Sequence, residues 1–115
     1  MQIRNVLDIW YKERAEIIIK EIYSNLESEF QKKKIIPYAF IIRKMQKCWG
    51  SCAPGKKIII NSELIKTPKH CIRFVLIHEM CYLKYPNHSS KFYQLQSYYS
   101  PDLEYWKNKL KQIMS

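Results

Sequence analysis

The chain has 115 residues, the length of a single domain, and its hydrophobic fraction of 47% is sufficient for a folded core. Only two residues are glycine, which excludes collagen, glycine-rich linkers and glycine-rich phosphate-binding loops. The formal net charge of +10 admits an acidic partner such as nucleic acid, but 16 of the 20 basic residues are Lys, which favours non-specific contact over base readout by Arg.

The cellular compartment can be predicted from the apolar runs and the cysteines. No apolar run approaches the ~18 residues of a membrane helix, and charged residues interrupt the segment where a signal peptide would need an apolar stretch. We therefore expect a cytoplasmic protein with no membrane contact. Its four cysteines are expected to be free thiols rather than disulfides or a four-cysteine zinc site.

The N-terminal segment, from Gln2 to Lys34, is predicted to form one long helix. Its apolar residues recur at three- to five-residue intervals, which places them on one stripe. This stripe consists of Leu7, Trp10, Ala15, Ile18, Ile22, Leu26 and Phe30. The three lysines at positions 32–34 suit the negative end of the helix dipole, and a phosphate-binding patch is the alternative interpretation.

Two β-rich segments follow, at residues 39–44 and 57–61. We expect them to pair as antiparallel neighbours, with residues 45–56 as the connection and a third short strand near Trp49. Helical periodicity returns over residues 68–84, with Thr67 as the cap and Pro68 at the first helical position. Two shorter helices follow, one around residues 90–99 and one from Leu103.

This order predicts an α+β fold with a small antiparallel sheet. A single domain would span residues 1–115. Its three parts would be an N-terminal helix over 1–36, the sheet over 37–67, and a motif helix with the C-terminal helices over 68–115.

A titratable pair, His78-Glu79, stands in the apolar centre of the motif helix, where unpaired polar groups are costly to bury. In H-E-x-x-H metallohydrolases, two His one turn apart bind one zinc and the Glu activates a water. Here Tyr82 occupies the position of the second His, so this half-motif is weak by itself. His88 lies ten residues after His78, beyond Pro86, where it can fold back toward the same metal.

Several spaced blocks resemble the YgjP-like metallopeptidases, relatives of the SprT and WLM zinc peptidase domains. Residues 43–52 are similar to that family's R-x-M and W-G-S-C signature, and residues 58–68 to its strand and following turn. Residues 75–92 resemble its H-E-L-C-H-L-x-x-P-N-H-S-x-x-F motif. Asp102 and the region of Trp106 fit its C-terminal helix.

The resemblance implies a zincin-like fold and a zinc-dependent peptidase whose metal is held by three His. Carried over by position, His78 and His88 are the first and third ligands and Glu79 is the general base. The second position holds Tyr82, a doubtful ligand, because ionising a phenol at neutral pH costs about 4 kcal/mol before a metal lowers that figure. We therefore expect weak zinc binding and low or absent peptidase activity.

Other interpretations of the same residues stay open. In one alternative, His78 is a core histidine hydrogen-bonded to a carbonyl. In another, His88 is a surface residue that caps a helix. The alternative function is a non-catalytic domain that binds protein or nucleic acid through its basic surface. For the enzyme, the expected partner is a peptide or protein substrate that adds a strand to the sheet edge near the motif helix.

Overall fold

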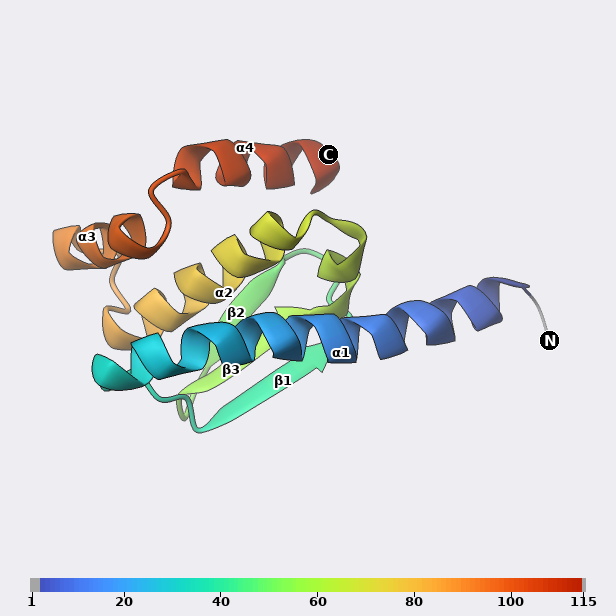
Figure 1. The fold of residues 1–115 in the computed structure, drawn as a ribbon, viewed down its shortest axis with the longest axis horizontal. Helices are drawn as coiled ribbons and strands as arrows, with labels where there is room; N and C mark the ends of the chain where they lie inside the picture. Colours follow the sequence, from blue (N-terminus) through green and yellow to red (C-terminus); the bar gives the residue numbers. More distant parts are fainter. Residues whose placement is uncertain (1–2, 115) are drawn as a thin grey trace.

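A computed structural model describes residues 3–114 and confirms the α+β fold. Its elements are α1 (Ile3–Lys32), β1 (Ala39–Arg43), β2 (Gly50–Ala53), β3 (Lys57–Asn61), the 3-10 helix η1 (Ser62–Lys66), α2 (Lys69–Lys84), α3 (Ser90–Tyr99) and α4 (Leu103–Met114) (Figure 1). Each predicted helix and strand is present, and η1 is an addition. The predicted helix start at Gln2 lies outside the described residues.

The sheet corrects one prediction, because it is mixed rather than antiparallel. Its strand order is β1-β3-β2, with β1 parallel to β3 and β2 antiparallel to β3. The tight turn over residues 54–56 makes β2 the hairpin partner of β3. Strand β1 therefore takes the other edge of β3, and the chain crosses the end of β3 to reach β2.

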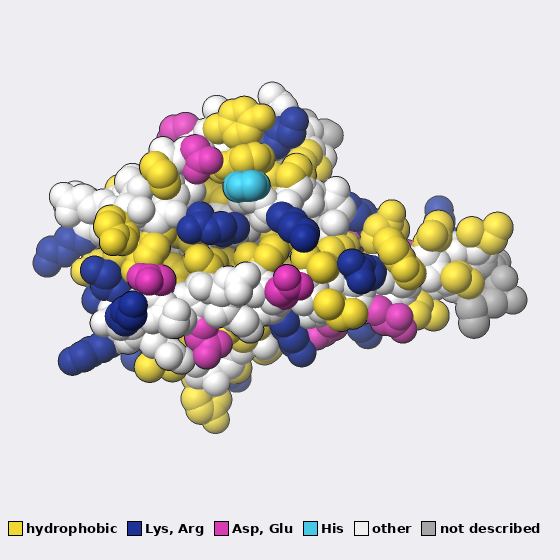
Figure 2. Space-filling view, in the orientation of Figure 1, with side chains coloured by type: hydrophobic (Ala, Val, Ile, Leu, Met, Phe, Trp, Pro, Cys, Tyr) yellow, Lys and Arg dark blue, Asp and Glu magenta, His cyan; other side chains and the backbone are white. Residues whose placement is uncertain are grey.

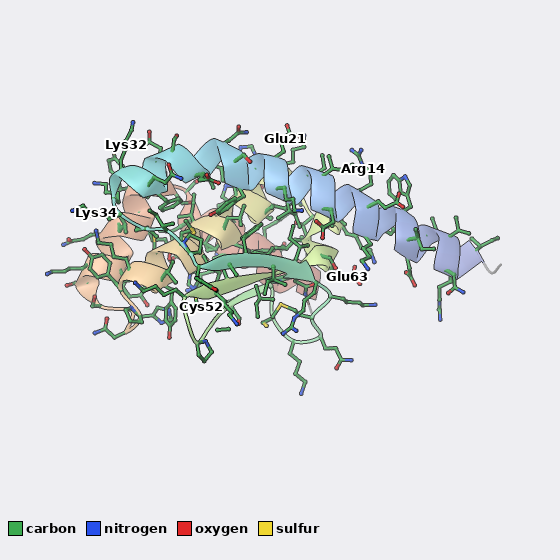
Figure 3. The ribbon with its side chains drawn as sticks, turned by 90° about the horizontal axis from the view of Figure 1, so that it is seen from below. Arg14, Glu21, Lys32, Lys34, Cys52 and Glu63 are labelled. Carbon is green, nitrogen blue, oxygen red and sulfur yellow. The ribbon has the colours of Figure 1, made fainter. Side chains whose placement is uncertain are left out.

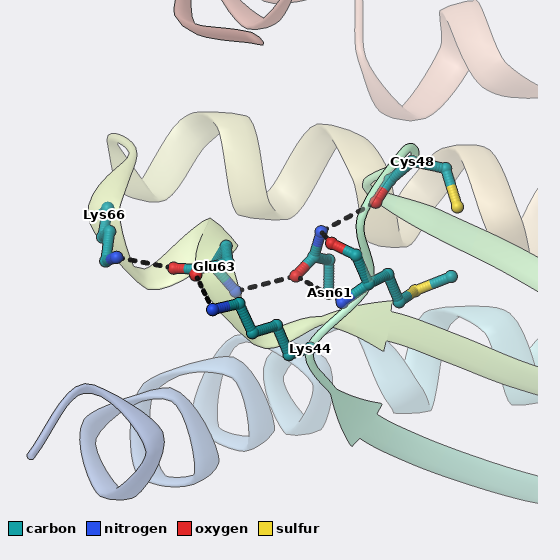
Figure 4. A network of polar contacts seen from close by, with 6 residues as sticks. Lys44, Cys48, Asn61, Glu63 and Lys66 are labelled. Carbon is teal, nitrogen blue, oxygen red and sulfur yellow. Dashed lines mark hydrogen bonds and ion pairs between the residues drawn. The ribbon is translucent and has the colours of Figure 1, made fainter. Parts of the chain in front are cut away.

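The side chain of Asn61 holds this crossing connection in place (Figure 4). Its amide nitrogen donates to the carbonyls of Met45 and Cys48, at 2.9 and 2.8 Å. Its oxygen accepts from the backbone N–H groups of Met45 and Glu63, at 3.3 and 2.9 Å. Because Asn61 is buried, these four contacts satisfy backbone groups that would otherwise lack partners at the end of the sheet.

Helices α1 and α2 pack on one face of the sheet, and α3 and α4 lie on the far side of α2 (Figures 1 and 3). Alternation along β3 turns Ile58 and Ile60 into the core beneath these helices. Tyr23 of α1 stacks on Phe40 of β1, with ring centroids 4.2 Å apart. Nine of the 16 residues of α2 are buried, so this helix is the centre of the core.

The apolar stripe predicted for α1 is buried over only part of its length. Ala15, Leu26 and Phe30 are buried, but Leu7 and Trp10 are 49% and 52% exposed. The first turns of α1 extend beyond the end of the sheet, where they have no layer to pack on (Figure 1). Periodicity indicates which face of a helix is apolar, but it does not give the length of the surface available to cover it.

The start of α2 also differs from the prediction. Pro68, rather than Thr67, is the N-cap, and the Thr67 hydroxyl donates to the Leu64 carbonyl at 2.7 Å. Thr67 therefore ends η1, because its side chain satisfies a carbonyl of that helix. Over the described residues, no helix combines the length and apolar character needed to cross a membrane.

Candidate active site

A cavity of about 420 Å³ lies where β2, α2, α3 and α4 meet. The sequence-predicted residues His78, Glu79 and His88 all line it. Apolar side chains such as Phe74 and Leu110 form much of the wall. A concave, largely apolar pocket with a few convergent polar groups is typical of a ligand site, and this volume is within the usual range.

His78 is held by a residue that the motif does not contain. Its Nδ1 lies 3.0 Å from Oε1 of Gln96, a buried side chain of α3. Because an amide oxygen can only accept, Nδ1 carries the proton and Nε2 keeps its lone pair. Burial, the largest effect, lowers the pKa of His78, which keeps the imidazole neutral near pH 7. A neutral imidazole with a fixed tautomer is the form that binds a metal.

Glu79 is buried at 6% exposure, and burial raises the pKa of its carboxyl to about 7. No ion pair to it is present among the described residues, so its carboxyl is not occupied by a structural contact. A carboxyl of this kind can take and return a proton near neutral pH.

Gly50 of β2 allows the sheet to approach Glu79. A Cβ at this position would lie 3.1 Å from Cγ of Glu79 and 3.0 Å from Cγ1 of Val75. The thiol of the neighbouring Cys52 donates to the backbone carbonyl of Glu79 at 3.3 Å. The edge strand β2 is therefore fixed directly beside the carboxylate, and a glycine is the residue that permits this distance.

His88 lies in the turn between α2 and α3 and faces His78, with ring centroids 5.6 Å apart. Its backbone is left-handed, with φ of 49°, a conformation that non-glycine residues adopt at a cost and that concentrates at functional sites. Phe92 packs against the His88 ring at a centroid distance of 4.6 Å. The turn and this contact direct His88 back toward α2, as the ten-residue spacing predicts.

Tyr82 lies one helical turn after His78, and its ring centroid is 4.9 Å from that of His88. Its side chain is half-buried and packs against the core rather than lining the cavity. The cavity therefore receives two imidazoles, those of His78 and His88, and not the phenol of Tyr82.

These residues fit a metal only in part. Over the part of the chain that the structure describes, no group of three or more His, Cys, Asp or Glu side chains could hold an ion. The neighbouring Cys81 does not complete the set, because its side chain is buried in the core and does not line the cavity. The donors present suit a two-imidazole site and do not form the three-ligand site of catalytic zinc proteins.

Sequence reasoning missed several residues of this region. Gln96 reads as a polar position of an amphipathic helix, and only tertiary contact reveals that it is buried. The α4 residues Glu104, Lys107 and Lys111 also line the cavity. His70, expected at the surface, is exposed and stacks on Trp106 at a centroid distance of 5.0 Å, which fixes α4 against the start of α2.

Comparisons with known proteins agree with this architecture. The family model for the YgjP-like metallopeptidase domain matches residues 1–113. No curated protein matches the chain in sequence. The crystal structure of the metallopeptidase zymogen of Methanocaldococcus jannaschii jannalysin is similar to it, with a TM-score of 0.66 and 18% sequence identity. That match covers 88% of this chain and 97% of the other, and at this identity it shows a shared fold.

Proposed function

The chain belongs to the YgjP-like metallopeptidase domain family, and we propose that it is a zinc-dependent peptidase of low activity. The observation that carries this proposal is the convergence of His78, Glu79 and His88, from α2 and the turn after it, on one cavity. Activity is low because the second ligand position holds Tyr82, which stays outside that cavity.

His78 and His88 are the residues that would hold the ion, and Gln96 keeps His78 in the correct tautomer. A bound zinc ion supplies Lewis acidity toward a peptide carbonyl and makes a water more acidic. Glu79 accepts the proton of the attacking water and returns it to the leaving amine. Two protein ligands hold an ion more weakly than three. The fraction of protein molecules with zinc bound would therefore limit the rate of peptide hydrolysis.

The substrate we propose is an extended peptide. Strand β2 pairs with β3 on one side only, so its other edge offers backbone groups for strand addition. Gly50 places this edge beside Glu79, and an added peptide would therefore pass close to the carboxylate. The free thiols of all four cysteines accord with the reducing cytoplasm that the sequence predicts.

The test is hydrolysis of a quenched fluorescent peptide in the presence of zinc. We expect a low rate for the wild-type chain, a higher rate for Tyr82→His, and loss of the gained rate in Tyr82→His/Glu79→Gln. Tyr105→His, which adds an imidazole at an exposed position of α4, is the matched control and should leave the rate unchanged. Absence of hydrolysis in every variant would favour a non-catalytic binding domain instead.

A further inference from the structure

We propose that the end of the molecule where α1 and α2 finish binds single-stranded nucleic acid. Three segments distant in sequence bring lysines together there: the end of α1, the turn between β2 and β3, and the end of α2. These residues, the lysine cluster, are Lys33, Lys34, Lys56 and Lys84. They line a hollow of about 350 Å³ together with aliphatic side chains, and no Asp or Glu of the described chain lines it. Figure 2 shows basic side chains gathered at this end.

The lysine cluster has no internal charge compensation. Ion pairs hold Lys20, Lys32, Lys44 and Lys66 elsewhere in the described chain, but none holds a member of the cluster. Lys84 donates to the carbonyl of Lys33 at 3.1 Å, which accounts for one lysine at a helix end. The helix dipole does not account for Lys56, which lies in a turn. The cluster therefore exceeds what the helix ends require.

The backbone supports the same conclusion. Lys34 and Lys56 have φ of 60° and 61°, in the left-handed region where glycine or asparagine is favoured. Lys34 follows the end of α1, and its N–H bonds to the Gln31 carbonyl while that of Ile35 bonds to the Phe30 carbonyl, both at 2.9 Å. Glycine is the usual residue at this position of such a helix end. The backbone conformation therefore does not require lysine at either place.

Two highly exposed aromatic residues indicate which anion binds. Tyr38 and Tyr98 are 82% and 71% exposed. The Tyr98 ring lies 5.7 Å from Nζ of Lys33, and the Tyr38 N–H donates to the Lys56 carbonyl at 2.9 Å. Lysines that follow a phosphate backbone, beside aromatic rings on which bases stack, are the recognition mode of single strands. A duplex and an acidic peptide do not offer free base faces, so the tyrosines favour single strands.

The test is fluorescence anisotropy with a labelled oligothymidylate of about 12 nucleotides, a length suited to such sites. For the wild-type chain, affinity should fall steeply between about 50 and 200 mM salt. The variant Lys33→Gln/Lys34→Gln/Lys56→Gln should bind at least about 10-fold more weakly, and its salt slope should fall by about 2. Tyr98→Ala should weaken binding about 5-fold or more with an unchanged salt slope.

The matched control is Lys12→Gln/Lys47→Gln/Lys69→Gln, which removes the same charge from exposed positions elsewhere and should have a smaller effect. Equal losses in the two triple variants would overturn the proposal, because binding would then follow net charge alone. Equal affinity for a duplex of the same length, or for polyglutamate, would overturn the assignment to single strands. Thermal melts of each variant establish that it is folded, and no readout depends on zinc or hydrolysis.

Discussion

The phenol ring of Tyr82 lies 4.9 Å from the His88 imidazole, centroid to centroid, at the position where the sequence resemblance implies a second imidazole. Helix α2, the turn at His88 and the support from Gln96 are all present around it. The surroundings of the proposed metal site are therefore present, whereas a phenol stands where the sequence resemblance implies a second imidazole. Variants at Tyr82 and at Gln96 therefore test a ligand position and the residue that supports His78 separately.

Gln96→Leu should alter the tautomer of His78. Without the Oε1 acceptor, Nδ1 loses the bond that keeps its proton there, and we expect a shift toward the form protonated at Nε2. Long-range ¹⁵N–¹H NMR of the imidazole nitrogens measures this directly. Gln94→Leu, an exposed position of the same helix, is the control. An unchanged His78 spectrum in Gln96→Leu would contradict the proposed role of Gln96.

Asn61→Ala should lower the free energy of unfolding by about 2–4 kcal/mol, because backbone groups of three residues lose their partners. Urea denaturation measures the change. Asn25→Ala on the exposed surface of α1 should change stability by less than about 0.5 kcal/mol. Similar values for the two variants would show that the crossing connection does not depend on Asn61.

Lys34→Gly should raise the free energy of unfolding by about 0.5–1 kcal/mol, since glycine adopts the observed φ of 60° without steric cost. Lys20→Gly, at an exposed position within α1, should instead lower the free energy of unfolding by about 1 kcal/mol. Urea denaturation of both variants checks the signs. Destabilisation by Lys34→Gly would mean that the lysine side chain itself stabilises the helix end.

The fold and the site differ in how far the sequence determines them. Periodicity identifies α2 and places His78 and Glu79 on it, and the spacing to His88 predicts its return across the turn. Local sequence patterns do not predict the parallel pairing of β1 with β3, because this pairing depends on β2 forming a hairpin on the other edge of β3. The burial of Gln96 and the exposure of Trp10 depend on which surfaces meet in space, which one sequence does not show.

The central claim is that the change from imidazole to phenol at Tyr82 is what weakens the metal site. Titration calorimetry with zinc, on the wild-type chain and Tyr82→His in one buffer, tests it most directly. We predict that Tyr82→His binds zinc at least about 10- to 100-fold more tightly, the range for the loss of even a supporting contact. Its melting temperature should also rise more with added zinc, because an ion bound to the folded state stabilises it. Equal affinities for the two chains would contradict the account.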